Sequence, residues 1–328
     1  NNQSFYLRTS QQQLNPDIGS YLANQAMATG LFMHSLHDRL GEPQYLERFK
    51  GDERAEPGMW IRAVASNTKS DAAGRSLSVD SNNRVVHLGG DLTQWDTEHG
   101  DRYHFGLMGA WGRADSVSRS KSTGSSARSK VEGYGAGAYL TWYDNAEQAE
   151  GWYSDLWSMY SWFNNSAENT KDYRSRAWTT SLETGYASTV KPFEKWRWMV
   201  EPQGQISYTH YSASTINDRN GLLVNNDDAS GVATRLGIRT YLQPTDGNEK
   251  AQFQPFLTVN WLWSDANNSM SFNNTTYSSD IPKNRFEAKL GLQAEVRQNT
   301  HIYGQISGQV GENNYTHKAA QLGLRYEF

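Results

Sequence analysis

The last ten residues of the chain alternate regularly between two kinds of position. One parity holds only apolar residues: Ala320, Leu322, Leu324, Tyr326 and Phe328. The other parity holds Gln321, Gly323, Arg325 and Glu327. Because successive side chains of a β-strand point to opposite faces, a period of two predicts a strand with one apolar and one polar face.

The same alternation recurs along most of the chain. In residues 284–297, six of the seven even positions are apolar, and no odd position carries an apolar side chain. Runs of this kind predict twelve strands, at 58–67, 84–95, 102–114, 130–143, 151–163, 176–190, 196–210, 231–242, 252–264, 284–297, 300–311 and 319–328. Most have ten or more residues, which suits a strand tilted across a bilayer, whereas strands of soluble proteins have about five or six.

Long connections alternate with short ones between these strands. "DSVSRSKSTGSSARS" and "NNSAENTKDYRS" are long, and "SVDSNN" is expected within a long first loop, whereas "KPFEK" and "QN" are short. Outer-membrane barrels have long outer loops and short periplasmic turns. The alternation therefore favours such a barrel over a soluble β-sandwich or lectin-like protein, which stays open as the alternative.

The composition is unusual for a water-soluble protein and fits a membrane barrel. The chain contains 12 Trp, 18 Tyr and 11 Phe, yet its mean hydropathy is −0.78. A barrel explains both values, because only every second residue meets lipid and aromatic residues gather at the two interfaces. No apolar run approaches the roughly 20 residues of a membrane-spanning helix. We predict an all-β fold, a 12-stranded antiparallel transmembrane β-barrel whose first strand pairs with its last.

The charge and the missing cysteines exclude several partners. The net charge of −4 gives no basic surface for nucleic acid. Without cysteine the chain can form neither a disulfide framework nor a thiolate metal site. No cofactor and no metal are expected. The polar parity predicts a lumen lined by paired charges, for which the candidates are Arg235, Arg239, Arg285, Glu287, Lys289, Glu295, Arg325 and Glu327.

The first 57 residues precede the barrel, predicted at 58–328, and contain one helical segment at about 18–40. Asp17 is a candidate N-cap and Gly41 a candidate C-terminal stop. As one helix, 23 residues would span ~34 Å, about one membrane thickness. The segment is thin and polar, so it could lie inside the barrel or pack outside it as a capping helix. If it lies inside, we expect Asn24, Gln25, His34 or Arg39 to contact the lumen charges.

The helix "YLANQAMATGLFMHSLHDRLG", the entry into strand 1 at "GMWIRA", the strand count and the ending "QLGLRYEF" together resemble the translocator domain of a classical monomeric autotransporter (type V secretion). Within that family the chain is most similar to the adhesin type called AIDA. The resemblance implies an outer-membrane monomer that exports a passenger domain located upstream of Asn1. It also implies that the helix occupies the pore after export. Gln321, Gly323, Tyr326 and Phe328 resemble the signal read by the barrel-assembly machinery.

Two other classes of barrel remain as alternatives. An outer-membrane protease or phospholipase would need catalytic groups such as Asp227 and Asp228 with His210, or Asp280. Acidic pairs in polar loops are usually solvated turns, and no Gly-x-Ser-x-Gly or His-Glu-x-x-His motif is present. In-barrel cleavage at Asn1 and Asn2, as in serine-protease autotransporters, is disfavoured because the pair precedes the helix by about sixteen residues. A passive porin would not need the helix. We therefore predict that the chain is not an enzyme.

Overall fold

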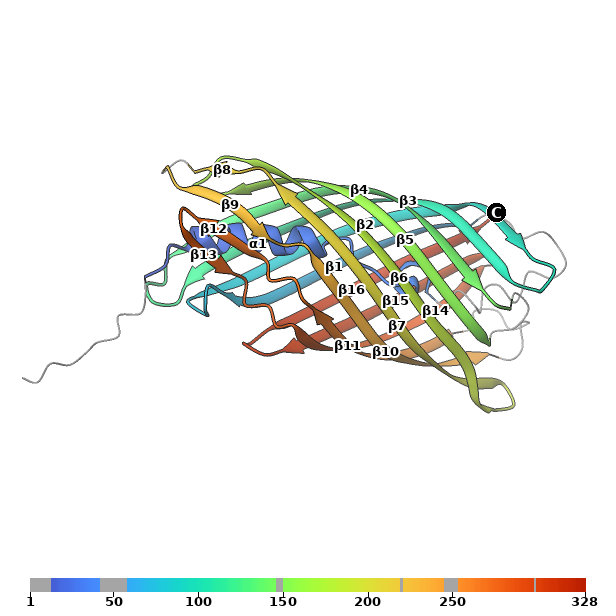
Figure 1. Cartoon of the computed structure of the whole chain (residues 1–328). Helices are drawn as coiled ribbons and strands as arrows, with labels where there is room; N and C mark the ends of the chain where they lie inside the picture. Colours follow the sequence, from blue (N-terminus) through green and yellow to red (C-terminus); the bar gives the residue numbers. More distant parts are fainter. Residues whose placement is uncertain (1–12, 42–57, 146–149, 219–220, 245–252, 298) are drawn as a thin grey trace, which may run out of the picture.

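Twelve long strands close into one antiparallel barrel in the computed structural model, which describes residues 13–41, 58–145, 150–218, 221–244, 253–297 and 299–328 (Figure 1). The strands are β1 (Gly58–Ala72), β2 (Leu77–Asp96), β3 (Arg102–Ser120), β4 (Ser126–Tyr143), β5 (Gly151–Ala167), β6 (Tyr173–Pro192), β7 (Trp196–Ala213), β10 (Gly231–Pro244), β11 (Phe253–Ser264), β14 (Asn284–Arg297), β15 (Thr300–Gly311) and β16 (Thr316–Glu327). Asn1, Asn2 and the predicted linker at 42–57 lie outside the described residues.

The barrel is closed by pairing of its first and last strands. Residues of β1 face residues of β16 from Gly58↔Glu327 to Lys69↔Thr316, so both strands have a neighbour on each side. In a bilayer every backbone donor and acceptor must be satisfied within the protein, which closure achieves. The predicted closed 12-stranded barrel is confirmed.

The two faces of the wall follow the alternation in the sequence. On β16, Leu322 is 68% exposed on the outside, whereas its neighbour Gln321 is 6% exposed and points inward. Leu290 on β14 and Ile306 on β15 also face outward. The outer face is therefore an apolar surface suited to lipid, and the inner face carries the charged groups of these strands.

At six places among the described residues an aromatic ring inside the barrel lies over a glycine directly opposite it on the neighbouring strand. The pairs are Trp60 over Gly89, Tyr139 over Gly106, Phe163 over Gly133, Tyr153 over Gly185, Phe256 over Gly291 and Tyr303 over Gly323. A Cβ atom on Gly323 would lie 1.9 Å from Cζ of Tyr303. These positions therefore require glycine, because any side chain would displace the ring.

Several strands extend further than their apolar alternation. β2 begins at Leu77, so "SVDSNN" lies in a strand, and the long first loop predicted there is wrong: the connection between β1 and β2 is residues 73–76. β3 and β4 likewise take up most of "DSVSRSKSTGSSARS". In these extensions polar residues pair across strands, as Ser81 does with Ser116 at 2.7 Å between hydroxyl oxygens. Strands that leave the bilayer need no lipid-facing apolar residues, so the period-two signal ends before the strands do.

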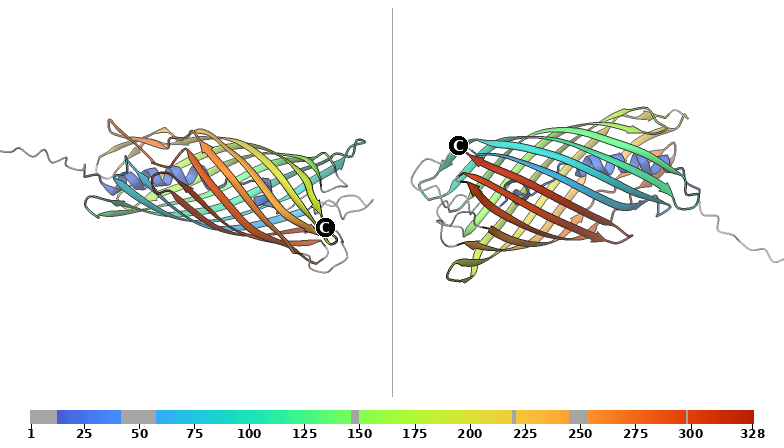
Figure 2. Two further views of the ribbon diagram at one scale, coloured as in Figure 1. Left: turned by 90° about the horizontal axis from the view of Figure 1, so that it is seen from below. Right: turned by 180° about the vertical axis from the view of Figure 1, so that it is seen from behind.

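Four short strands from two predicted long loops form a second sheet, here called the cap sheet. Its strands are β8 (Ile216–Asn217), β9 (Leu223–Asp228), β12 (Ser269–Phe272) and β13 (Thr275–Ser278). The cap sheet lies at the end of the barrel opposite the C-terminus (Figures 1 and 2). A backbone bridge between Ala72 and Ser279 joins the sheet to the end of β1.

The N-terminal segment lies inside the barrel as two helices, α1 (Pro16–Gly30) and α2 (Leu36–Leu40) (Figure 2). The prediction of one continuous helix over 18–40 is wrong, because residues 31–35 break it. Ser35 starts the second helix with a capping box, in which its hydroxyl accepts from the Asp38 N–H and the Asp38 carboxylate accepts from the Ser35 N–H. Among the described residues, no helix is long and apolar enough to cross a membrane.

The ends of the helical segment are set by local contacts. Asn15, and not Asp17, is the N-cap of α1: its side chain accepts a hydrogen bond of 3.0 Å from the Asp17 N–H. Gly41 ends α2 as predicted, with a φ of 74° that favours glycine and an N–H that donates to the His37 carbonyl at 3.0 Å.

Candidate functional site

The outer half of α1 is held by an apolar collar near the cap sheet. Tyr21 and Leu22 of α1 are fully buried. The Tyr21 ring lies 5.9 Å from the ring of Tyr173 on β6 and 5.8 Å from that of Phe272 on β12. The remaining apolar members of the collar include Leu14, Ile18, Leu77, Ile216, Val224 and Met270. The cap sheet and the barrel wall thus enclose this part of the helix together.

The polar residues of α1 contact neutral groups. The Asn24 amide donates to the Ser166 carbonyl at 3.2 Å. The Gln25 amide donates to the Ser269 carbonyl at 3.1 Å and to the side chain of Asn226. The expectation that Asn24 and Gln25 contact lumen charges is therefore wrong, because they lie at the level of the cap sheet and the outer ends of the strands.

The connection between the two helices lies on an apolar stretch of the wall formed by β3, β4 and β5. The rings of Phe32 and Phe163 stack with centroids 5.9 Å apart. Gly112 on β3 makes room for this packing, since a Cβ there would lie 2.8 Å from the Leu31 side chain. His34 also contacts no opposite charge: its ring stacks on Trp157 at 4.3 Å. The prediction of a charged lumen is wrong for this part of the wall.

Beyond this connection, α2 enters a ring of charged side chains on the barrel wall, here called the lumen ring. Its members are Asp155, Glu183, Glu201, Arg235, Lys289 and Arg62. Arg39 donates to both carboxylate oxygens of Asp155 on β5, at 3.1 and 2.7 Å. It also donates to the Thr141 hydroxyl at 3.1 Å, and its guanidinium carbon lies 4.1 Å from the centroid of the Tyr139 ring. Arg39 and Asp155 are both 0% exposed. Removing either partner of such a buried, hydrogen-bonded ion pair is strongly destabilising, because the other charge is then left buried without a counter-charge.

The neighbouring strands β6 and β7 add two more carboxylates to the same side of the ring. Nε2 of His37 lies 3.2 Å from Oε1 of Glu201. Glu183 accepts a 3.0 Å hydrogen bond from the backbone N–H of Leu36. The second oxygen of Glu183 lies 2.8 Å from Nη2 of Arg235 on β10, which joins the acidic side of the ring to the basic side.

Asp38 points toward the basic side of the lumen ring. Its carboxylate oxygens lie 2.8 and 3.0 Å from Nζ of Lys289 on β14, and one of them accepts from the Gln305 amide at 2.7 Å. The barrel wall also binds the backbone of α2. Gln321 donates to the Asp38 carbonyl at 2.6 Å, and the Tyr303 hydroxyl donates to the Arg39 carbonyl at 2.5 Å.

The predicted lumen charges divide between the lumen ring and other levels of the barrel. Arg235 and Lys289 belong to the ring, and Glu287 lies beside Lys289 at 3.7 Å. Arg239 lies directly opposite Glu201 on the neighbouring strand and packs over Phe256. The remaining predicted residues lie elsewhere: Arg285 packs over Tyr315, Arg325 pairs with Glu327, and Glu295 lies half-buried near the end of β14.

The period-two pattern does not point to the acidic side of the ring or to Arg62. Arg62 on β1 donates to the side chain of Gln321 at 3.1 Å. Asp155 lies on a face of β5 whose other inward residues include Tyr153, Trp157 and Met159. With aromatic residues on both faces, that strand does not show which parity points into the lumen.

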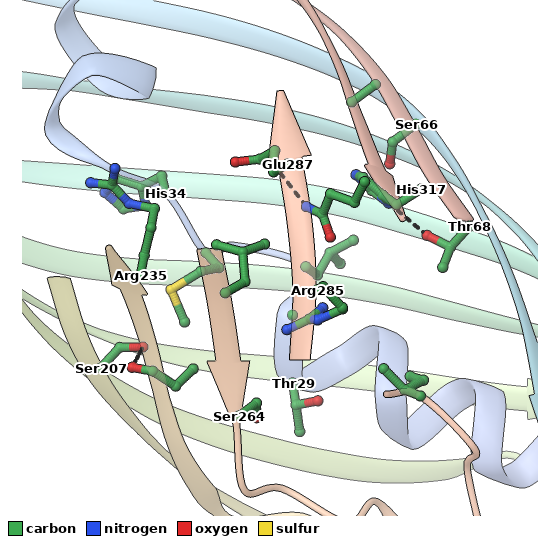
Figure 3. A pocket seen from close by; sticks show the side chains of 18 of the residues that line it. Thr29, His34, Ser66, Thr68, Ser207, Arg235, Ser264, Arg285, Glu287 and His317 are labelled. Carbon is green, nitrogen blue, oxygen red and sulfur yellow. Dashed lines mark hydrogen bonds between the residues drawn. The ribbon is translucent and has the colours of Figure 1, made fainter. Parts of the chain in front are cut away.

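A cavity of about 370 Å³ lies beside α1, on the side away from the apolar wall (Figure 3). Side chains from several strands surround it, among them Ser207, Arg285, Glu287 and His317. His317 contacts Thr68 across the strands at 2.8 Å, and Gln309 donates to Glu287 at 2.9 Å. Ser35, Asp38 and Gln305 line it where it meets the lumen ring. α1 therefore leaves part of the lumen open, and the ring bounds that space.

The residues named for the alternative enzyme have separate structural contacts. The Asp280 carboxylate accepts from the Arg75 N–H at 2.6 Å, which links the connection between β13 and β14 to the β1–β2 turn. His210 contacts Ser230 at 3.4 Å on the outside of the wall. Asp227 and Asp228 lie at the end of β9. Within the described ranges, no group of three His, Cys, Asp or Glu residues could hold a metal ion.

The family model described as "Autotransporter beta-domain" matches residues 59–307 of this chain. The chain belongs to the autotransporter β-domain family. A curated relative, the uncharacterized protein YdeU of Escherichia coli K12, is 34% identical over 326 residues, which is 95% of this chain and 70% of YdeU. The autotransporter adhesin AIDA-I of Escherichia coli is 24% identical over 97% of this chain, which spans only 25% of AIDA-I.

The fold agrees with the family. The solved transport unit of the autotransporter AIDA-I from Escherichia coli superposes with a TM-score of 0.84, covering 96% of this chain and 100% of that structure at 23% identity. The chain is thus an autotransporter translocator domain of the bacterial outer membrane, on the surface of which the family displays its passengers. Translocator domains are transport units.

Proposed function

We propose that this autotransporter domain exports a passenger located upstream of Asn1 and then anchors it through residues 13–41. The supporting observation is the path of this segment. Leu14 lies in the apolar collar at the cap-sheet end, and Arg39 lies in the lumen ring, so the segment runs along the lumen from one level to the other. A chain held in this way connects an external passenger to the membrane barrel. In this proposal residues 1–57 are linker and pore helix, and 58–328 are the barrel.

An adhesin is the passenger class that we propose. The support is the similarity to the autotransporter adhesin AIDA-I over nearly the whole of this chain. The proposal does not extend to catalysis by the barrel. The buried carboxylates Asp155, Glu183 and Glu201 bind cations or backbone groups of the N-terminal segment and its neighbours, which gives them a holding role. The enclosed segment also argues against a passive porin.

We propose further that the C-terminal residues are read by the barrel-assembly machinery and that the barrel is a monomer. Tyr326 and Phe328 face the lipid side, with ring centroids 5.4 Å apart, and are accessible to a partner in the membrane. Gln321 and Gly323 point inward, where they bind Asp38 and make room for Tyr303. Closure between β1 and β16 removes the strand edges through which barrels could otherwise pair.

Surface display of an epitope fused upstream of Asn1 tests export. We expect whole cells to bind the antibody, and external protease to remove the epitope while the barrel stays protected in the outer membrane. A matched fusion carrying Phe328→Asp should lose folded barrel and surface signal together. Correctly folded barrel with the epitope accessible only after permeabilisation would contradict export. Normal assembly of the Phe328→Asp fusion would contradict only the terminal signal.

A further inference from the structure

The lumen is closed at the level of α2, although α1 is the longer helix. α1 lies against the wall near β2–β5, and the connection that follows it packs on Gly112, Phe163 and Trp157. The open cavity lies on the other side of α1. Burial alone does not distinguish the two levels, because Tyr21 and Leu22 of α1 are as fully buried as Leu36 and Arg39. The cavity distinguishes them: it runs beside α1 and meets the lumen ring at Ser35, Asp38 and Gln305. The seal therefore coincides with residues 35–40, whose sequence is SLHDRL.

The charges of the ring are separated around the wall into two arcs. The acidic arc consists of Asp155, Glu183 and Glu201 on the adjacent strands β5, β6 and β7. The basic arc continues in the same direction through β10, β14 and β1, with Arg235, Lys289 and Arg62, and the carboxylate of Glu287 lies beside Lys289 within it. The charge of the inner wall at this level therefore changes across the lumen, from negative on one side to mainly positive on the other.

The charged residues of segment 35–40 are complementary to the two arcs. His37 and Arg39 face the acidic arc, and Asp38 between them faces the basic arc. The ring also binds the segment's main chain at three points: the N–H of Leu36 and the carbonyl groups of Asp38 and Arg39. Side-chain charge and main-chain hydrogen bonds together are the features by which proteins recognise a peptide.

We propose that the lumen ring is a peptide-recognition site for the segment SLHDRL, and that occupation of this site, and not the presence of α1, closes the barrel. The inference deepens the proposed function, on which it rests, by naming what stops the exported chain. A segment whose charges stood in the opposite order would set an arginine against Lys289 and an aspartate against Asp155. The ring therefore favours this order of charges in this register.

The test exchanges the two charges in the full-length protein, as Asp38→Arg together with Arg39→Asp. Length, composition and net charge stay the same. We expect the open fraction of single channels in planar lipid bilayers to rise roughly 100-fold, as for loss of a buried ion pair. The control is Gln25→Ala, which removes the contacts of α1 with Asn226 and Ser269 and should leave the conductance unchanged. Heat-modifiable gel mobility reports that each barrel is folded.

A rescue separates recognition from damage. Adding Asp155→Arg and Lys289→Asp to the exchanged segment restores opposite charges on both sides, and each larger side chain takes the space that its partner has vacated. We expect the low conductance of the wild type to return. A folded exchanged chain that stays closed, or one that the rescue leaves open, would overturn the proposal. So would opening by Gln25→Ala. These currents are recorded on purified protein, so they hold or fail independently of the epitope experiment on cells.

Discussion

Replacing Asp155 with Asn is expected to let trypsin cut after Arg39 roughly 100 times faster than in the wild-type barrel, because an unpaired buried charge costs about 3 kcal/mol or more. In the wild type the peptide bond after Arg39 is protected from trypsin, because Arg39 is 0% exposed and donates to both oxygens of Asp155. The neutral amide keeps the volume of the side chain and removes its charge, so the segment leaves the ring more often. Mass spectrometry of the fragment that ends at Arg39 measures the rate.

The matched control is Asp115→Asn. Asp115 pairs with Arg113 at 2.6 Å, but these side chains are 47% and 42% exposed on the outside of the wall. Exposed pairs contribute at most about 1 kcal/mol, so cleavage after Arg39 should not change. Equal cleavage rates for wild type, Asp155→Asn and the control would show that the Arg39–Asp155 pair does not hold the segment.

Gly323→Ala is expected to lower the free energy of unfolding by about 3 kcal/mol in all, from overpacking and a lost hydrogen bond. The new Cβ would lie 1.9 Å from Cζ of Tyr303 and force its ring away from β16. Displacement of the ring also breaks the hydrogen bond from the Tyr303 hydroxyl to the Arg39 carbonyl. The substitution therefore affects the pairing of the last two strands and the lumen ring together. Urea unfolding in lipid vesicles, followed by tryptophan fluorescence, measures the loss.

Gly308→Ala on β15 serves as the control for this substitution. No atom lies within 4 Å of a Cβ built at Gly308, so alanine there should be neutral or slightly stabilising. If both glycine variants lost the same stability, the cause would be a general backbone effect, and the packing of Tyr303 would not explain the requirement for glycine.

The sequence predicts the barrel because lipid acts on every second residue of a strand. On β14 and β16 an apolar parity stands against a charged one, which identifies the strand and its two faces from local sequence alone. The alternation fails where its cause is absent. Beyond the bilayer, as at residues 80–83 of β2, both faces are polar. On β5 the inward face also carries an aromatic residue, Trp157, which packs against His34, and both faces of that strand are therefore aromatic.

The remaining features depend on contacts between distant parts of the chain. β9 and β12 of the cap sheet have only six and four residues and pair across a gap of more than forty positions. No local alternation of apolar and polar residues therefore predicts them. Ser35 and Asp38 form a local capping signal that predicts a helix start, yet the sequence alone also fits a continuous helix. Of the four predicted contact residues, only Arg39 meets a charge, because only α2 reaches the lumen ring.

The most direct test of a barrel closed by its own N-terminal segment is the conductance of the full chain compared with a chain that lacks residues 18–40. Both proteins are brought to the folded, heat-modifiable form and inserted into planar lipid bilayers. The full chain should pass little current, and the shortened chain should show a larger and steadier pore. Equal conductance of the two folded proteins would contradict the presence of the segment in the lumen.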